Sequence, residues 1–186
     1  MTLRDELTAF LPYNTQEAVD REAMLYFLDS YPSDMLFSRN TPAHFTVSAW
    51  IVNTVRTHVL MAFHNIYRSW SWTGGHALAP EGLSKFAVQK AMQETGLQTV
   101  HLISENIYSI EIIASNGYFD KNSYVSSHLH LNLTYLIEAN EMDPIHSDAQ
   151  ENCGVKWFDL RRAAMQPNGA WIRSIYEKLN AKLDLL

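Results

Sequence analysis

Two glycines and two glutamates near the middle of the chain are of residue types that could bind an ion. Gly74 and Gly75 end the stretch SWSWTGG, Glu81 follows in the next loop, and Glu94 lies late in a predicted helix. Hard divalent ions prefer carboxylate ligands. Glycine lets the main chain approach a ligand closely because it has no side chain. The segment is therefore the first candidate for a functional site.

A helix over residues 83–95 must position Glu94. Leu83, Phe86 and Ala87 fall on one side of it, at the spacing of a buried helix face. Gly96 is well placed for the left-handed residue that closes a helix. The glycines that precede this helix are expected to form a tight turn after a short strand, with Trp70 and Trp72 on one face of that strand.

Strands dominate the middle of the chain. HFTVSAWIVN alternates apolar and polar residues, and HVLMAFH follows it after a short polar connection, as in an antiparallel hairpin. Two long strands are predicted over residues 99–115 and 124–139, and GVKWFDL is a further strand. One internal helix among many strands predicts a mixed sheet flanked by helices, an α/β (α+β) sandwich.

Helices are predicted at both ends of the chain. Residues 2–11 and 15–31 have helical patterns, and Asn14 with Glu17 has the spacing of a capping box. Further helices are expected after Arg161 and from Ala170 onward. We expect residues 1–42 to form a helical extension packed on a core domain of residues 43–186.

The segment that contains the glycines resembles the Nudix box. Gly75, five residues, Glu81, seven residues and then QKAMQETGL reproduce the frame of that box, which ends R-E-U-x-E-E-x-G-U with U a bulky aliphatic residue. The strands before the box and GVKWFDL also resemble those of the Nudix family. The resemblance covers roughly residues 43–165.

The resemblance implies a Nudix-type α/β/α sandwich with a mixed sheet and a diphosphate-cleaving activity. Nudix hydrolases cleave a diphosphate linked to a nucleoside or another group, using water and Mg²⁺ or Mn²⁺. The cation is needed because a diphosphate repels an attacking hydroxide until its charge is neutralised. A small-molecule diphosphate ligand and one divalent ion are therefore the expected partners.

The box departs from the family pattern where that chemistry wants charge. Gln89 replaces the arginine, and Lys90 and Gln93 replace two glutamates. The two glutamate changes, +2 for lysine and +1 for glutamine, make the site +3 more positive. A unit charge pair at about 4 Å is worth roughly 4 kcal/mol near a protein surface, so a standard multi-metal mechanism is impaired.

The remaining acidic residues define a reduced site. The resemblance implies that Glu94 is a metal ligand together with the Gly74 carbonyl, and that Glu151, just before the late strand, completes one ion site. Glu81 would support the loop. We therefore expect Glu94, Glu81 and Glu151 to be the catalytic residues.

Five further residues are candidates for substrate binding. Lys90 could bind a phosphate directly in place of a metal, although an ion pair with Glu94 one turn away is the commoner role. Trp72 could stack on a base and Arg68 could reach a phosphate. His128 and His130 share one face of a strand and could donate to phosphate or a base. A zinc site is not expected there, because no third strong ligand stands in register.

Composition excludes several classes of function. The net charge is −6 and no run is rich in lysine or arginine, which argues against binding to a nucleic-acid polymer. No run approaches the length that spans a membrane, and MTLRDELTAF does not resemble a signal peptide. Cys153 is the single cysteine, so an internal disulfide is excluded. A cytoplasmic protein is the default expectation, and the oligomeric state stays open, with a homodimer among the alternatives.

Two functions remain open on the sequence alone. The first is a Nudix-type hydrolase of a nucleoside-diphosphate-type small molecule with weak or altered metal dependence. The second is a catalytically inactive protein of the same fold that binds a nucleotide or a sugar-nucleotide through Lys90.

Overall fold

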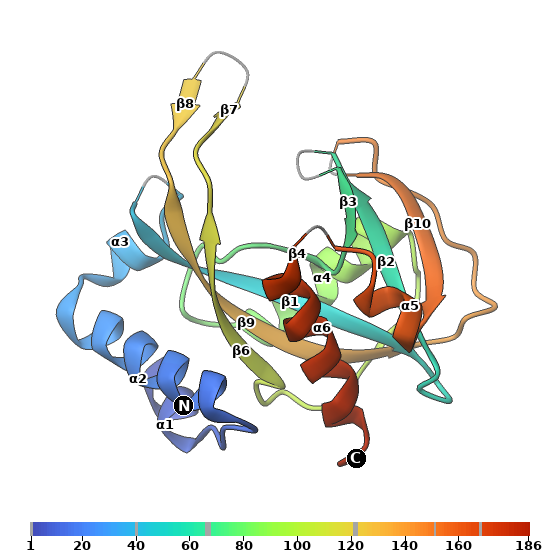
Figure 1. Cartoon of the computed structure of the whole chain (residues 1–186), viewed down its shortest axis with the longest axis horizontal. Coiled ribbons are helices and arrows are strands. Elements are labelled where there is room, and N and C mark those ends of the chain that lie inside the picture. The colour runs from blue at the N-terminus through green and yellow to red at the C-terminus, as the bar shows by residue number, and fades with distance from the viewer. Residues whose placement is uncertain (1, 40, 66–67, 121–122, 151, 168) are drawn as a thin grey trace.

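A computed structural model shows one mixed β-sheet with helices on both faces (Figure 1). The structure describes residues 2–39, 41–65, 68–120, 123–150, 152–167 and 169–186. The predicted α/β sandwich with a mixed sheet and N-terminal helices is confirmed. None of the described helices has the length and apolarity needed to cross a membrane.

The longest strands lie side by side at the centre of the sheet. β1 (Ala43–Asn53) and β9 (His128–Ala139) pair in parallel over eleven residues, from Ala43 opposite Leu129 to Asn53 opposite Ala139. Every residue of β1 is buried, which is expected of a strand covered on both faces. This pairing brings together two segments more than 80 residues apart in the sequence.

The other strands extend the sheet on either side of this pair. The main path runs β10-β2-β1-β9-β5, while β3 pairs with β2, β4 with β1 and β6 with β9. Their bounds are β2 His58–His64, β3 Ser69–Ser71, β4 Thr73–His76, β5 His101–Leu102, β6 Ser109–Ser115 and β10 Asn152–Asp159. A separate hairpin, β7 (Tyr118–Asp120) with β8 (Ser123–Val125), projects away from the sheet (Figure 1).

The helices agree closely with the prediction. α4 spans Leu83–Thr95, and Gly96 follows it in the left-handed conformation with φ 74°, as the pattern indicates. α1 (Leu3–Ala9) and α2 (Thr15–Ser30) precede the sheet, with the short α3 (Ser33–Leu36) after them. α5 (Leu160–Ala164) and α6 (Ala170–Leu183) end the chain.

Alternation along β1 creates two hydrophobic cores on opposite faces of the sheet. Phe45 and Val47 pack with Ala87 and Ala91 of α4, and the side chains of α1 and α2 join this core. Trp50 and Val52 face α5 and α6 instead. Figure 1 shows α4 behind the sheet and α6 in front of it. Alternate residues of β1 therefore contribute to two different hydrophobic cores.

Two details of the strand prediction are wrong. The expected strands over residues 99–115 and 124–139 are each interrupted. β5 and β6 are separate strands, and β8 pairs with β7 in a small separate sheet, whereas β9 belongs to the main sheet. The glycines also form no tight turn. Gly74 and Gly75 lie within β4, which pairs antiparallel with β1 and places them opposite Ser48 and Val47.

Candidate functional site

The last glutamate of the box-like segment contacts β4, which contains Gly74 and Gly75 and which we call the glycine strand. Glu94 is buried at the C-terminal end of α4, and its Oε1 accepts a hydrogen bond from the Gly74 backbone N–H at 2.9 Å. α4 reaches this position because its apolar side, including Ala87 and Ala91, packs on the sheet. The carboxylate predicted to bind a metal therefore lies against the main chain of β4.

Lys90 lies across the same strand. Its Cε is 3.0 Å from the point that a Cβ on residue 75 would occupy, so the absence of a side chain at Gly75 makes room for the lysine stem. Phe86 of α4 borders the same space, with its ring 3.6 Å from that point. A cation is thus placed beside the glycines, where the family pattern has a carboxylate.

Gln93 contacts the loop before β10. Its Nε2 donates to Asp148 Oδ2 at 3.2 Å. Hydrogen bonds from the Gln150 backbone N–H and from this amide lower the pKa of Asp148, which keeps the carboxyl ionised. The substitution at position 93 therefore ties α4 to the 148–150 loop.

Asn152 contacts the backbone of Glu94. Its Nδ2 donates to the Glu94 backbone carbonyl at 2.9 Å, while its buried Oδ1 has no hydrogen-bond partner. A buried oxygen without a partner is unusual in a folded protein. This oxygen was not predicted as a site atom, because the sequence pattern drew attention to the neighbouring Glu151 instead.

Several predicted site residues lie outside this cluster. Glu151 falls outside the described residues, and Glu81 is exposed in the loop before α4. The Arg68 guanidinium lies 5.7 Å from the centre of the Phe63 ring. Trp72 packs against the Tyr176 ring of α6, with ring centres 5.1 Å apart.

Four histidines gather on the opposite face of the sheet from α4. His44 of β1 stands in register with His130 of β9, His128 lies two residues earlier on β9, and His76 ends β4. Each offers one ring nitrogen, and these four nitrogens all lie within 4.8 Å of one another. We call this group the histidine cluster.

The expectation that His128 and His130 lack a third ligand in register is wrong. Parallel pairing of β1 with β9 aligns His44 with His130, and antiparallel pairing of β4 with β1 brings in His76. A pattern search along the chain cannot reveal these pairings because 84 residues separate His44 from His128. The usable signal was that all four histidines lie in or beside predicted strands.

Hydrogen bonds and burial favour neutral imidazoles in the cluster. His128 Nδ1 lies 2.7 Å from the Ser126 carbonyl oxygen, which fixes the proton on Nδ1 and leaves the lone pair on Nε2. That Nε2 lies 2.9 Å from His130 Nε2. Burial, with smaller contributions from neighbouring positive groups, lowers the pKa of His76 and that of His130 to about 3.

Comparison with solved structures identifies the fold. An Ap4A hydrolase from C. elegans, in a binary complex, superposes with a TM-score of 0.56 at 17% identity over 76% of this chain and 98% of its own. A MutT protein from Methanosarcina mazei gives 0.54 at 15% identity over 74% and 93%. A Nudix hydrolase from Clostridium perfringens gives 0.53 at 20% identity over 78% and 99%.

The chain has the Nudix fold. No protein-family model matches the sequence, and no curated protein matches it significantly. The Nudix fold is therefore recognised through its three-dimensional arrangement at identities of 20% or less in these three structures. The predicted relationship to Nudix proteins is confirmed at the level of the fold.

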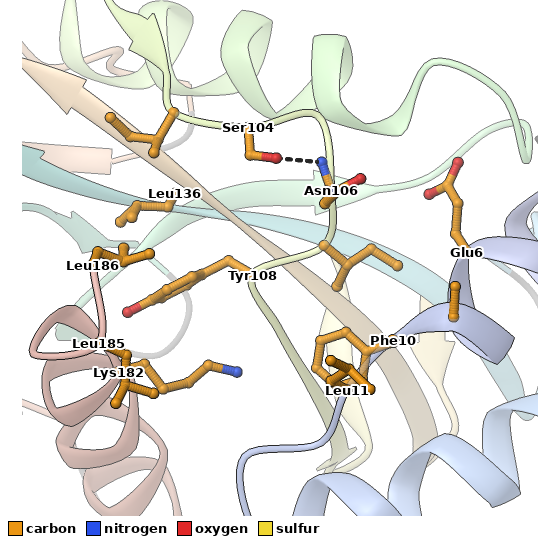
Figure 2. A pocket seen from close by; sticks show the side chains of 13 residues that line it. Glu6, Phe10, Leu11, Ser104, Asn106, Tyr108, Leu136, Lys182, Leu185 and Leu186 are labelled. Carbon is orange, nitrogen blue, oxygen red and sulfur yellow. Dashed lines mark hydrogen bonds between the residues drawn. The ribbon is translucent and has the colours of Figure 1, made fainter.

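A cavity of about 420 Å³ opens elsewhere on this Nudix fold, between α1 and the C-terminus. Figure 2 shows Phe10 and Leu11 on one side and Leu185 and Leu186 on the other, with the Tyr108 ring between them. The Tyr108 hydroxyl donates to the Leu179 carbonyl at 2.7 Å. None of the predicted site residues that the structure describes lines this cavity, which is therefore separate from the box-like segment.

Proposed function

We propose that the protein is a Nudix-type hydrolase of a diphosphate linkage in a nucleoside-diphosphate-type small molecule, with an altered dependence on metal. The observation that carries the proposal is the contact between Glu94 Oε1 and the Gly74 N–H on a Nudix fold. This contact puts a buried carboxylate beside the glycine strand, as the box-like spacing predicts.

The residues around Glu94 fit a single hard cation. The Glu94 carboxylate and the unpartnered Asn152 Oδ1 are oxygen donors, the type that Mg²⁺ and Mn²⁺ take. We propose that Glu94 and the Gly74 carbonyl hold the ion, with Glu151 as a further ligand. When bound, such an ion would neutralise phosphate charge.

Lys90 accounts for the altered metal dependence. Its stem passes over Gly75, so its ammonium can reach an anionic group placed at the glycine strand. An ammonium neutralises phosphate charge as a point charge, without the geometric demands of a metal. We propose that Lys90 binds the phosphates, that Glu81 supports the loop, and that Arg68 and Trp72 contribute to binding of the remainder of the substrate. The substrate-binding role predicted for His128 and His130 is not part of this proposal, because both lie on the face of the sheet opposite α4.

The test compares the natural protein with two variants on a panel of nucleoside diphosphate derivatives, with Mg²⁺ or Mn²⁺. Metal-dependent release of phosphate or a nucleoside monophosphate is expected from the natural chain. We expect Glu94→Gln to lower kcat at least about 100-fold, because the variant loses the charged ligand of the proposed ion. A factor of 100 corresponds to roughly 2.7 kcal/mol of transition-state stabilisation. Undiminished turnover by Glu94→Gln would contradict the proposal.

Lys90→Glu/Gln93→Glu is the reciprocal variant. It restores the carboxylates of the Nudix pattern, so we expect it to raise the activity and to shift its metal dependence toward Mg²⁺.

Activity in this variant combined with none in the natural chain would support the second candidate, a binding protein without turnover. The position of Lys90 over Gly75 favours that candidate. A higher melting temperature of the natural chain with a nucleotide in the presence of EDTA would then support the binding protein.

A further inference from the structure

We propose that His44, His76, His128 and His130 form a binding site for a divalent transition metal ion such as zinc. This site is distinct from the Glu94 site of the proposed function. The histidine cluster lies on the face of the sheet that carries Thr46 and Asn132, whereas Glu94 and Lys90 belong to α4 on the other face.

The four side chains converge from three strands. Ring centres are 4.8 Å apart for His44 and His76, 5.1 Å for His44 and His130, and 4.8 Å for His128 and His130. Tetrahedral zinc bound at about 2.1 Å by nitrogen requires ligand atoms about 3.4 Å apart. The candidate atoms already lie within 4.8 Å of one another, so side-chain rotations alone can close the site.

The protonation pattern leaves lone pairs directed into the cluster. His44 Nδ1 lies 3.4 Å from the Thr41 carbonyl oxygen, while its buried Nε2 has no hydrogen-bond partner. His128 Nδ1 is held by the Ser126 carbonyl at 2.7 Å. Metal-binding histidines commonly donate their other ring N–H to a backbone carbonyl, which fixes the ligating nitrogen. Both residues have this arrangement.

The donor set decides the class of ion. Four imidazoles offer nitrogen alone, which suits Zn²⁺, Co²⁺, Ni²⁺ or Cu²⁺ and gives little affinity for Mg²⁺ or Ca²⁺. His44 is 1% exposed and His128 8% exposed, so the inner half of the site is dry. His76 and His130 are partly exposed, and an ion can enter from their side.

A buried group of histidines could instead serve only as packing. Stacked rings contribute contact area, but the buried His44 Nε2 would then remain without a hydrogen-bond partner, which is unfavourable in a protein interior. A metal satisfies that nitrogen together with the other three. The two explanations differ in what zinc does to the protein.

The experiment titrates the full chain, stripped with a chelator and dialysed, with ZnCl₂, CoCl₂ or MgCl₂ in the absence of substrate. We expect one equivalent of Zn²⁺ to bind, a higher melting temperature with Zn²⁺ than with Mg²⁺, and a visible Co²⁺ spectrum that reports nitrogen ligation. His76→Asn and His130→Asn should each weaken Zn²⁺ binding by at least about 10-fold.

His101→Gln is the matched control, because His101 is exposed on β5 and outside the cluster. Circular dichroism of each metal-free variant reports whether it folds, and the partly exposed His76 and His130 are chosen because they tolerate substitution best. Absence of stoichiometric Zn²⁺ binding to the natural chain would overturn the proposal, as would an equal loss of affinity in His101→Gln. Because no substrate is present, neither outcome depends on whether the protein is a hydrolase.

Discussion

Gly74 has a steric role that its place in the box-like segment does not reveal. A Cβ on this residue would overlap the Val47 carbonyl oxygen and come within 3.0 Å of Ser48 Cα, both of them backbone atoms of β1. The close approach of β4 to β1 therefore requires glycine. The same approach positions the Gly74 N–H for its bond to Glu94.

The first prediction compares alanine at the two adjacent glycines. Gly74→Ala should lower the free energy of unfolding by at least about 2 kcal/mol, because backbone atoms must move to admit the methyl group. Gly75→Ala should cost less than about 1 kcal/mol, because its methyl group meets the flexible end of Lys90 at 3.0 Å. Urea unfolding measures both. Equal losses in the two variants would show that the fit of β4 on β1 is not the cause.

At the scale of elements, the sequence predicts the structures that depend only on neighbouring residues. The spacing of apolar residues and the position of Gly96 predict α4 with the bounds that the structure has. The pairing of β1 with β9 and of β4 with β1 depends on residues far apart, so the histidine cluster could not be found by periodicity. Two adjacent glycines usually break a strand, so the sequence predicts a turn there, whereas in the structure they allow close contact with β1.

The central strands are also joined by a buried polar side chain. Asn132 of β9 accepts hydrogen bonds at Oδ1 from Thr46 Oγ1 at 3.0 Å and from Ser48 Oγ at 2.8 Å, both in β1. Its Nδ2 donates to Glu111 Oε2 of β6 at 2.9 Å. One amide thus connects three adjacent strands on the face that carries the histidine cluster.

The second prediction concerns replacement of the Asn132 amide. Asn132→Leu should lower the free energy of unfolding by about 3 kcal/mol or more, because three buried hydroxyls, those of Thr46, Ser48 and Thr134, and the Glu111 carboxylate each lose a partner. Asn152→Leu is the control, since among the described residues the Asn152 side chain makes one hydrogen bond, to the Glu94 carbonyl. We expect a loss of about 1–2 kcal/mol there. Denaturant titration of both variants decides the point, and comparable losses would contradict the bridging role.

At the scale of the whole molecule, a buried ionic network joins the two ends of the chain. Glu17 of α2 is fully buried, and its Oε1 accepts hydrogen bonds from Lys182 Nζ at 2.8 Å and Ser109 Oγ at 2.7 Å. Lys178 Nζ lies 3.2 Å from Glu17 Oε1 and 2.9 Å from Glu111 Oε1. The sequence indicated Glu17 only as a capping residue, because its lysine partners lie more than 160 residues later.

The third prediction concerns this network and acid. Burial alone would raise the pKa of Glu17, but the charges of Lys178 and Lys182, with hydrogen bonds from Lys182 and the Tyr13 N–H, bring it below its ordinary 4.5. A carboxyl with a lowered pKa in the folded state stabilises the protein fully above its unfolded pKa. That stabilisation is lost as pH falls from about 4.5 through the lower folded value.

Glu17→Gln should therefore cost about 3–5 kcal/mol at pH 7, because it leaves two lysines with one carboxylate between them. The cost should shrink as pH falls below about 4.5, where the natural carboxyl becomes protonated. The pKa values of His76 and His130, near 3, make both proteins less stable below pH 6.5 when no metal is bound. That contribution cancels in the difference between natural protein and variant.

Glu22→Gln, in an exposed pair with Arg21, is the control and should cost at most about 1 kcal/mol at any pH. Urea unfolding from pH 3 to 8 measures the difference, and a cost that stays constant across this range would show that the charge of Glu17 does not hold α2 to α6.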